Sequence, residues 1–576
     1  EVGGDLTATV QGQVAKVHGT VRFDTPSPAM NLEASAENFD PVPLLAVIAE
    51  ARPQAASAIA AADYAGPVDV TAKVGGTFAD PMIDGDVKVT SGQAAGISFQ
   101  NASAHARLLN RVLYLQDVHA GVFGGQVAGE GELSLDDRAY TAHVKADNID
   151  AAAVQTYAAA RTSALSGLDS LSGRVRADVT AHGQGADVDK FWADGSVSLS
   201  KGGYGALSID SLSASLAVSG RDIKIDYLSA KLPNNSNLGL EGEIQGGEAL
   251  DLAFYGGHFD LSLLRNFDAR ADLTGFCDFK GQLTGSLGDP AVTLDFSANH
   301  GKAFQQPFDS LVLRASGSLD KVTVDDFRME NGGKETWIVT GSVGLTGEKN
   351  IDLRVDCMGA RMEDVAALIA PDQPITGNVD NTIHFTGTLD HPEAVGYIHF
   401  YRGSYRGVLL SGMDGDYFLK DDVLRLQVFH IYSPMVDAVL NGTVGLDESL
   451  NLDIDVRDID MKRVEHKLPY EVSGHGTFEG HVTGFINAPV FDGTLDAKSL
   501  TLNGVDIPRA FGHAHYEGGM ITLDRFGFLQ GDGSYDLELQ ADTESHALTG
   551  NVVVQDADLT NLCALLNQKN DFVQGT

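Results

Sequence analysis

The sequence predicts a mainly β fold, an elongated repeat array of antiparallel strands with short interspersed helices. Six times along the chain an acidic residue opens an apolar, helix-like run, at intervals of 110, 110, 103, 97 and 98 residues. Such self-similarity is the signature of an array. The chain also has 65 Gly but only 17 Pro, which suits many short strands joined by tight turns. The six acids are Asp40, Asp150, Asp260, Glu363, Asp460 and Asp558.

The acidic steps divide the chain into one continuous array. Its parts are a leading partial repeat (1–39), five repeat units (40–149, 150–259, 260–362, 363–459 and 460–557) and the start of a next unit (558–576). An acid before a helical run accepts hydrogen bonds from the free N–H groups of the first turn. We therefore expect these acids to be helix caps and not catalytic groups.

A second landmark, Pro-x-x-x-Gly, supports the same period. It recurs at Pro81, Pro392 and Pro489, with variants at Lys190 and Pro290, and the next acidic step follows 69, 68, 69, 70 and 73 residues later, respectively. We interpret the landmark as a turn signal. The nearly constant distance predicts a fixed β part in each unit, while the helical part varies in length.

Alternation of apolar and polar residues identifies the strands and a shared apolar face. Segments such as 85–90, 195–200, 396–401 and 450–456 alternate with a period of two, as strands with one buried and one solvated side do. The apolar positions that would share this face are Val87, Val89, Val197, Leu199, Leu294, Phe296, Ile398, Phe400, Leu424, Leu426, Leu452, Ile454, Leu495, Leu537 and Leu539.

Six helices are too few to cover the apolar face of so many strands, so the sheet must fold over onto itself. Two closures meet this need: a flattened sandwich with a dry core, or a long U-shaped trough whose apolar wall stays accessible. At about 13 residues per strand and turn the chain would hold about 40 strands, and at ~4.8 Å per strand the stack would be on the order of 190 Å long.

The charge and hydropathy of the chain exclude several classes of partner. The net charge is −39, from 79 acidic and 40 basic residues, with no run rich in Lys or Arg. Such a field repels phosphate backbones and anionic membrane surfaces, so we expect no nucleic-acid partner. No run approaches the ~18 apolar residues that a membrane-spanning helix needs. Any membrane anchor is therefore expected outside this sequence.

Three segments combine a turn, the Pro-x-x-x-Gly landmark and an alternating strand: GTFADPMIDGDVKVTSG (76–92), GTLDHPEAVGYIHFYRG (387–403) and GFINAPVFDGTLDAKSL (484–500). This pattern resembles the AsmA-like superfamily, and within it the TamB family, over residues 68–566. The resemblance implies a U-shaped β-taco fold in a periplasmic protein of a double-membraned bacterium, attached to the inner membrane by an anchor outside this sequence.

The resemblance also implies a function and partners. It implies that phospholipids travel along the hydrophobic trough between the inner and outer membranes, that the protein contributes to outer-membrane biogenesis, and that an outer-membrane barrel assembly protein is a partner. On this interpretation the fifteen apolar positions line the lipid groove. A charge at Phe296 or Phe400 is then expected to block lipid passage while leaving the fold largely intact.

The sequence contains no motif that supports catalysis or a cofactor. The patterns G-x-S-x-G, H-E-x-x-H and GK[ST] are absent. His513 and His515 would share one face of a strand, but no third metal ligand is visible beside them. We therefore expect neither an enzyme nor a cofactor or metal. The alternative function is a structural role with a closed β core, as a scaffold in an envelope assembly or as a spacer or adhesin rod.

Overall fold

The computed structural model describes residues 2–10, 13–23, 27–51, 60, 62–161, 170–269, 271–303, 306–363, 365, 374–405, 407–464, 471–545, 547–566, 568 and 575–576. Within these residues the fold is mainly β. Its 33 strands belong to one antiparallel sheet that does not close into a barrel, and its helices are few and short. The predicted fold class is confirmed. The strands number 33 and not about forty, because many are 12 to 15 residues long.

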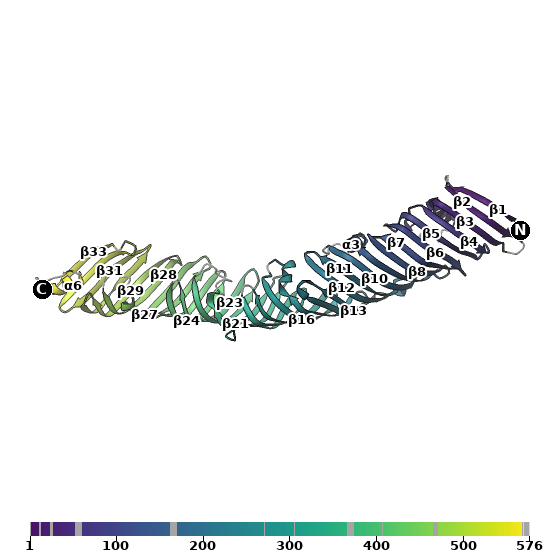
Figure 1. Ribbon diagram of the computed structural model, residues 1–576. Helices are drawn as coiled ribbons and strands as arrows, with labels where there is room; N and C mark the ends of the chain where they lie inside the picture. The colour runs from purple at the N-terminus through teal and green to yellow at the C-terminus, as the bar shows by residue number, and fades with distance from the viewer. Residues whose placement is uncertain are drawn as a thin grey trace. The chain divides into compact units, whose positions relative to one another are not determined.

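The chain forms two compact units, Glu1–Phe296 and Ser297–Thr576, and the division falls inside strand β17 (Asp289–Ala303). In each unit the strands lie side by side in sequence order (Figure 1). Neighbouring strands pair as simple antiparallel hairpins, for example β5 with β6 and β26 with β27.

Unit 1 contains the elements β1 (Val2–Val10), β2 (Gln13–Arg22), β3 (Ala29–Phe39), α1 (Val42–Ala51), β4 (Val68–Gly76), β5 (Pro81–Ala94), β6 (Ile97–Leu109), β7 (Val112–Val122), β8 (Gly125–Ser134), β9 (Ala139–Asp150), α3 (Ala151–Ala159), β10 (Leu171–Gln184), η2 (Val188–Lys190), β11 (Trp192–Tyr204), β12 (Leu207–Ser219), β13 (Asp222–Lys231), η3 (Pro233–Asn235), β14 (Asn237–Gln245), β15 (Ala249–Asp260), η4 (Leu261–Asn266) and β16 (Leu273–Ser286).

Unit 2 contains the elements β18 (Gln306–Ser318), β19 (Lys321–Asn331), β20 (Glu335–Gly344), β21 (Ile351–Arg361), β22 (Ile375–Gly387), β23 (Pro392–Tyr405), β24 (Val408–Lys420), β25 (Val423–Tyr432), β26 (Val436–Gly445), β27 (Ser449–Asp460), α5 (Met461–Val464), β28 (Val472–Phe485), β29 (Ala488–Leu502), β30 (Val505–Glu517), β31 (Met520–Gln530), β32 (Gly533–Asp542), β33 (Leu548–Gln555) and α6 (Leu559–Leu565).

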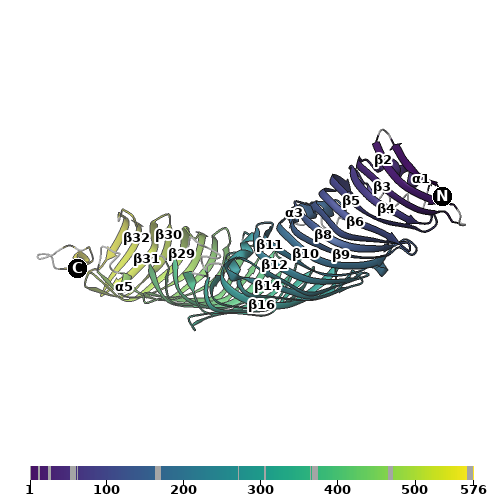
Figure 2. The same ribbon diagram turned by 45° about the vertical axis from the view of Figure 1, so that its right-hand side comes forward.

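Each interval between two acidic steps holds six strands, and α1, α3, η4 and α5 precede the first strand of their intervals. Between Asp40 and Asp150 these are α1 and β4 to β9, and between Asp460 and Asp558 they are α5 and β28 to β33. Because six is an even number and strand direction alternates, α1, α3, η4 and α5 each follow an odd-numbered strand, whereas η2 follows β10. The helical segments that follow odd-numbered strands therefore lie along one rim of a unit's sheet, the helix rim, as α1 and α3 do in unit 1 (Figure 2). The turns from even-numbered to odd-numbered strands form the opposite rim, the hairpin rim.

Four of the six acidic residues cap a helical segment, as the sequence predicts, and these are Asp40, Asp150, Asp260 and Asp558. The carboxylate of Asp150 accepts hydrogen bonds from the N–H groups of Ala152 and Ala153 at 3.0 and 3.3 Å, and Asp260 and Asp558 accept similar bonds at the start of η4 and α6. Glu363 differs, because its carboxylate accepts a hydrogen bond from the N–H of Gly377 in β22, at 3.2 Å. The contacts of the four aspartates satisfy backbone donors that the first turn of a helix leaves free.

The Pro-x-x-x-Gly landmark is not a turn, which corrects the sequence interpretation. Each landmark proline lies at the start of β5, β23 or β29 and pairs with a glycine five residues earlier, as Pro81 does with Gly76. The turn lies in the four residues between them, although in the third segment Phe485 and Ala488 form one further pair. Gly76, Gly387 and Gly484 have φ of 81°, 83° and 84°, and a Cβ on any of them would lie 2.5 or 2.6 Å from a backbone oxygen of the turn. These turns therefore require glycine.

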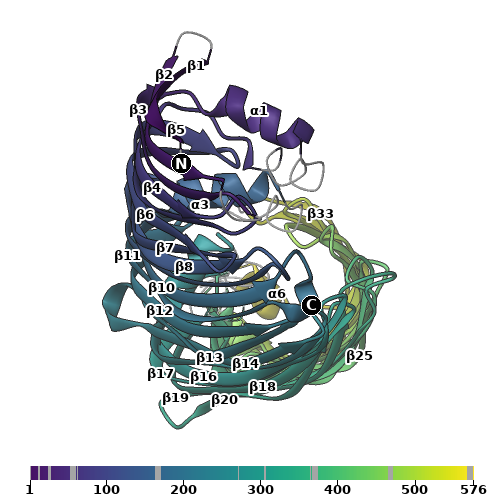
Figure 3. The same cartoon turned by 90° about the vertical axis from the view of Figure 1, so that its right-hand side faces the viewer.

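β-Bulges bend the strands near the helix rim. β15 has a bulge between Gly256 and Phe259, and β25 has one between Leu426 and Phe429. Each contains a residue with positive φ, such as His258 (48°) and Val428 (46°). Bulges bend a strand and increase its twist. In unit 1 the strands curve so that α1 and α3 lie on the concave side of the sheet (Figure 3).

Candidate functional site

One face of the sheet in each unit is apolar, and we call it the inner face. In unit 1, Phe39, Val68 and Val89 are buried on this face, and Tyr64, from the crossover after α1, packs against them. In unit 2, Met461 of α5 and Leu565 of α6 pack against the apolar face of β29 and β30. The helical crossovers thus cover the part of the inner face that adjoins the helix rim.

A large apolar cluster of unit 2 is made by strands alone. Leu426, Phe429, Leu452 and Val482 are buried at its centre, and ten partly buried residues surround them. All fourteen come from the seven consecutive strands β23 to β29. The ten surrounding residues are Ile398, Met413, Tyr417, Leu424, Ile431, Leu440, Val444, Leu450, Ile454 and Phe491. These side chains lie on one face of one sheet, so they contact one another sideways. The ten surrounding side chains therefore keep part of their apolar surface exposed.

The fifteen positions predicted from alternation are spread over eight strands and do not converge on one pocket. Those that the structure buries are Val89, Leu199, Phe400, Leu426 and Leu452. Those that it leaves partly exposed are Val87, Val197, Leu294, Phe296, Ile398, Leu424, Ile454, Leu495, Leu537 and Leu539. None of the fifteen is fully exposed. The positions therefore describe a half-covered surface and not a discrete cavity.

Phe400 does not tolerate a charge, which corrects the expectation that Phe400→Asp leaves the fold intact. Its side chain is 0 % exposed. The ring lies over Gly377 and Gly403, where an added Cβ would come within 2.7 and 2.2 Å of ring atoms. A carboxylate here would be buried without a partner, at a cost of several kcal/mol. Phe296 is only partly buried, so the correction concerns Phe400 alone.

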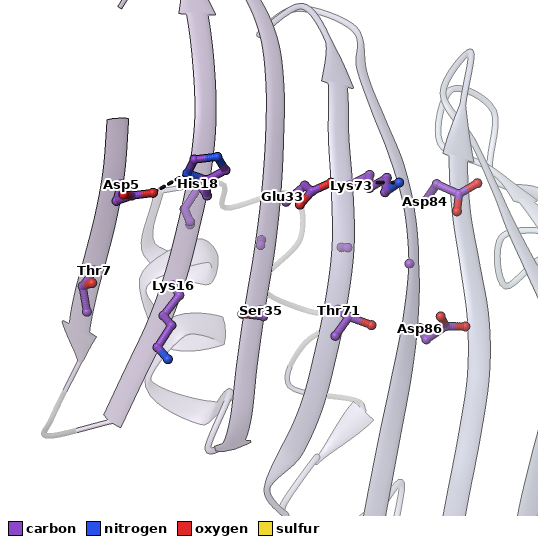
Figure 4. A pocket seen from close by; sticks show the side chains of 14 residues that line it. Asp5, Thr7, Lys16, His18, Glu33, Ser35, Thr71, Lys73, Asp84 and Asp86 are labelled. Atoms are coloured by element: carbon purple, nitrogen blue, oxygen red, sulfur yellow. Dashed lines mark hydrogen bonds and ion pairs between the residues drawn. The ribbon is translucent and has the colours of Figure 1, made fainter. Parts of the chain in front are cut away.

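The opposite, outer face is polar and carries ladders of alternating charge. In β1 to β5 the register places Asp5, His18, Glu33, Lys73 and Asp84 side by side in one row, and a second row runs parallel to it (Figure 4). Both rows line a shallow hollow of about 560 Å³. Opposite charges on neighbouring strands stabilise a sheet by small amounts. The mixture of acids and bases is typical of a solvated face.

Many histidines of the outer face pair with a carboxylate on a neighbouring strand. His475 Nδ1 lies 2.8 Å from Asp458 Oδ1, and His105 Nδ1 lies 3.0 Å from Asp86 Oδ1. The other histidines with a carboxylate within 4 Å are His18, His143, His384, His430, His481, His513 and His515. These pairs were not predicted, because the sequence does not reveal which polar residues the register brings together.

The carboxylates shift the protonation of some of these groups. The hydrogen bond to Asp458, and the charges of Asp458 and Asp460, raise the pKa of His475 above its usual 6.5. The hydrogen bond to Asp86, opposed by a smaller desolvation effect, raises the pKa of His105. Hydrogen bonds from His515 and His513 lower the pKa of Asp492 below 3.8.

We expect the protein to melt at a higher temperature at pH 6 than at pH 8.5. A histidine whose pKa is raised by folding adds stability that is fully present below about 6.5 and is lost as the pH rises through the folded pKa. Calorimetry across this range checks the prediction, and His105→Gln with His475→Gln should flatten the profile. An unchanged profile in this double variant would contradict the assignment.

His513 and His515 do lie on one face of β30, as predicted, and Asp492 of β29 contacts both. In the part of the chain that the structure describes, however, no three His, Cys, Asp or Glu side chains are arranged to hold a metal ion. Burial raises the pKa of the Cys277 and Cys357 thiols to about 12, so both stay protonated at neutral pH. Among the described residues, no helix has both the length and the apolar character needed to cross a membrane.

Comparison with known proteins identifies no relative whose function could be transferred to this chain. No protein-family model matches the sequence, and no curated protein matches it either.

Proposed function

We propose that the inner face binds the acyl chains of phospholipids, and that the protein is a bridge-like lipid transfer protein between the inner and outer membranes. The observation that carries this proposal is the strand-only apolar cluster of β23 to β29, whose ten peripheral side chains remain partly exposed. A soluble protein rarely leaves so large a continuous apolar surface uncovered without a ligand or partner for it.

The chemistry of the inner face suits an acyl chain. Transfer of each CH₂ group from water to an apolar surface gains ~0.8 kcal/mol, whatever the identity of the apolar partner. A lining of aliphatic and Phe side chains therefore holds a flexible chain without a specific contact. A net charge of −39, with acidic side chains on the outer face, helps to keep an apolar-lined protein in solution.

The cellular setting belongs to the same proposal and is supported by the sequence resemblance. We place the protein in the periplasm, attached to the inner membrane through a segment outside this sequence, where it contributes to outer-membrane biogenesis. An outer-membrane barrel assembly protein is the proposed protein partner.

Native mass spectrometry of the chain, purified from a bacterial host without detergent, tests the proposal. We expect phospholipids to remain bound and to be recovered by organic extraction. A correctly folded chain that carries no lipid, and takes up none from vesicles, would contradict the proposal and favour the scaffold or spacer role with a closed β core.

A further inference from the structure

Exposed apolar side chains on the hairpin rim continue the inner face beyond the end of the sheet. In β20 the inward positions are Val339, Gly341 and Val343, and the next position of the same alternation is Leu345, in the turn. Leu345 is 44 % exposed. In β26 the inward position Val444 is likewise followed by Leu446, which is 63 % exposed. In β20 and β26 the row of inward-facing apolar side chains therefore continues by one residue beyond the last residue of the strand that pairs with its neighbour.

The same relation holds at turns in both units, and we call these residues the apolar lip. In unit 1 the lip consists of Phe78, Leu135 and Leu287, and in unit 2 of Leu319, Leu345, Leu389, Leu446 and Ile486. All but Ile486 are between 44 and 63 % exposed. Single exposed leucines need no explanation. Eight apolar residues at one equivalent position of the fold are a surface with a common role.

Backbone hydrogen bonds between successive turns hold the lip in place. The N–H of Leu345 donates to the carbonyl of Asp320 at 2.7 Å, that of Leu389 to Lys349 at 3.1 Å, and that of Leu446 to Asp422 at 2.9 Å. Each of these hydrogen bonds connects the backbone of one hairpin-rim turn to the backbone of the next turn on the same rim. The leucine side chains are thus presented from an ordered backbone and not from a loose loop.

Acidic residues beside the lip form hydrogen bonds within their own turn or with the neighbouring turn of the same rim. Asp447 follows Leu446, and its carboxylate accepts hydrogen bonds from the N–H and hydroxyl of Ser449 at 3.0 and 2.6 Å. The hydroxyl of Thr346, which follows Leu345, donates to Asp320 at 2.6 Å. The polar groups satisfy the turn, while the leucines remain available to an apolar ligand.

We propose that the apolar lip is the place where phospholipid acyl chains enter and leave the inner face. This inference rests on the proposed lipid transfer function. The lip is continuous with the inner face, whereas Met461 and Leu565 cover that face near the helix rim. A chain that crosses the hairpin rim thus moves from one apolar side chain to the next, and the headgroup stays in water beside the polar turn.

The test compares the loading rate of the full chain with that of a triple variant, Leu345→Gln, Leu389→Gln and Leu446→Gln. Donor vesicles contain a fluorescent phosphatidylethanolamine, and fluorescence reports its transfer to the protein. Because an amide replaces the branched apolar end of each leucine and no longer shields the crossing chain from water, we expect loading about tenfold slower, with the final amount of bound lipid unchanged. The matched control is Leu409→Gln, since Leu409 is 66 % exposed at the start of β24, at the helix rim.

Two results would overturn the lip as the entry point while leaving the proposed function in place. One is wild-type loading kinetics in the triple variant, and the other is an equal slowing by Leu409→Gln. A wild-type chain that takes up no fluorescent lipid overturns the proposed function itself, and the lip inference with it.

Discussion

Ile454→Asp is expected to reduce the phospholipid bound by the protein about tenfold or more, because a carboxylate held against an acyl chain costs several kcal/mol. Ile454 is a partly buried member of the strand-only cluster of unit 2, opposite Leu440 and Gly480 on the neighbouring strands. Its position lets an introduced carboxylate keep contact with water, so the sheet should still form. Lipid content per chain, measured after extraction, checks the prediction.

The matched control is Asn451→Asp, which adds the same charge to the outer face of the same strand. Asn451 is exposed, and its substitution should change neither lipid content nor melting temperature. A second control, Ile454→Ala, shortens the side chain without adding a charge and should lower lipid content only slightly. If Ile454→Asp binds as much lipid as Asn451→Asp while both fold, the inner face is not the lipid site.

Phe400→Ala is expected to lower the free energy of unfolding of the region around β22 and β23 by about 3–5 kcal/mol, the usual cost of removing a buried aromatic ring. The ring of Phe400 fills the space over Gly377 and Gly403, and neither glycine has a side chain that could move into the cavity. Denaturant unfolding followed by far-UV circular dichroism measures the loss.

The control for Phe400 is Tyr397→Ala on the same strand. Tyr397 is 45 % exposed and faces the outer side of β23, so its removal should cost far less than that of Phe400. Phe400→Leu should recover part of the stability. Equal losses for Phe400→Ala and Tyr397→Ala would contradict the burial that the structure assigns to Phe400.

Sequence patterns were sufficient to predict the mainly β fold, the antiparallel strands and the capping role of Asp150, Asp260 and Asp558. Each of these depends on residues that are close in the chain. Alternation also identified Leu424 and Ile454 as partly buried positions on an apolar face, because side-chain direction in a strand has a fixed period of two.

The remaining features depend on contacts between distant residues. The burial of Phe400 requires that Gly377 of β22 lie beneath its ring, and the His475–Asp458 pair requires the register of β27 and β28. A bulge between Val456 and Ile459 shifts this register by an amount that no local sequence pattern indicates. The apolar lip did leave a trace, since Leu135, Leu319, Leu389 and Leu446 each precede an Asp directly. The Leu-Asp pattern predicts a shared apolar surface only when the structure shows that these turns lie on the same rim.

The measurement that tests lipid binding by the inner face most directly is site-specific photocrosslinking in bacterial cells. A benzophenone amino acid is placed at Leu424 or Ile454, on the inner face, and at Gln427 or Asn451, on the outer face of the same two strands. We predict phospholipid adducts, identified by mass spectrometry, at the two inner positions and not at the two outer ones. Adducts absent from all four positions, or equally frequent on both faces, would contradict a lipid-binding inner face.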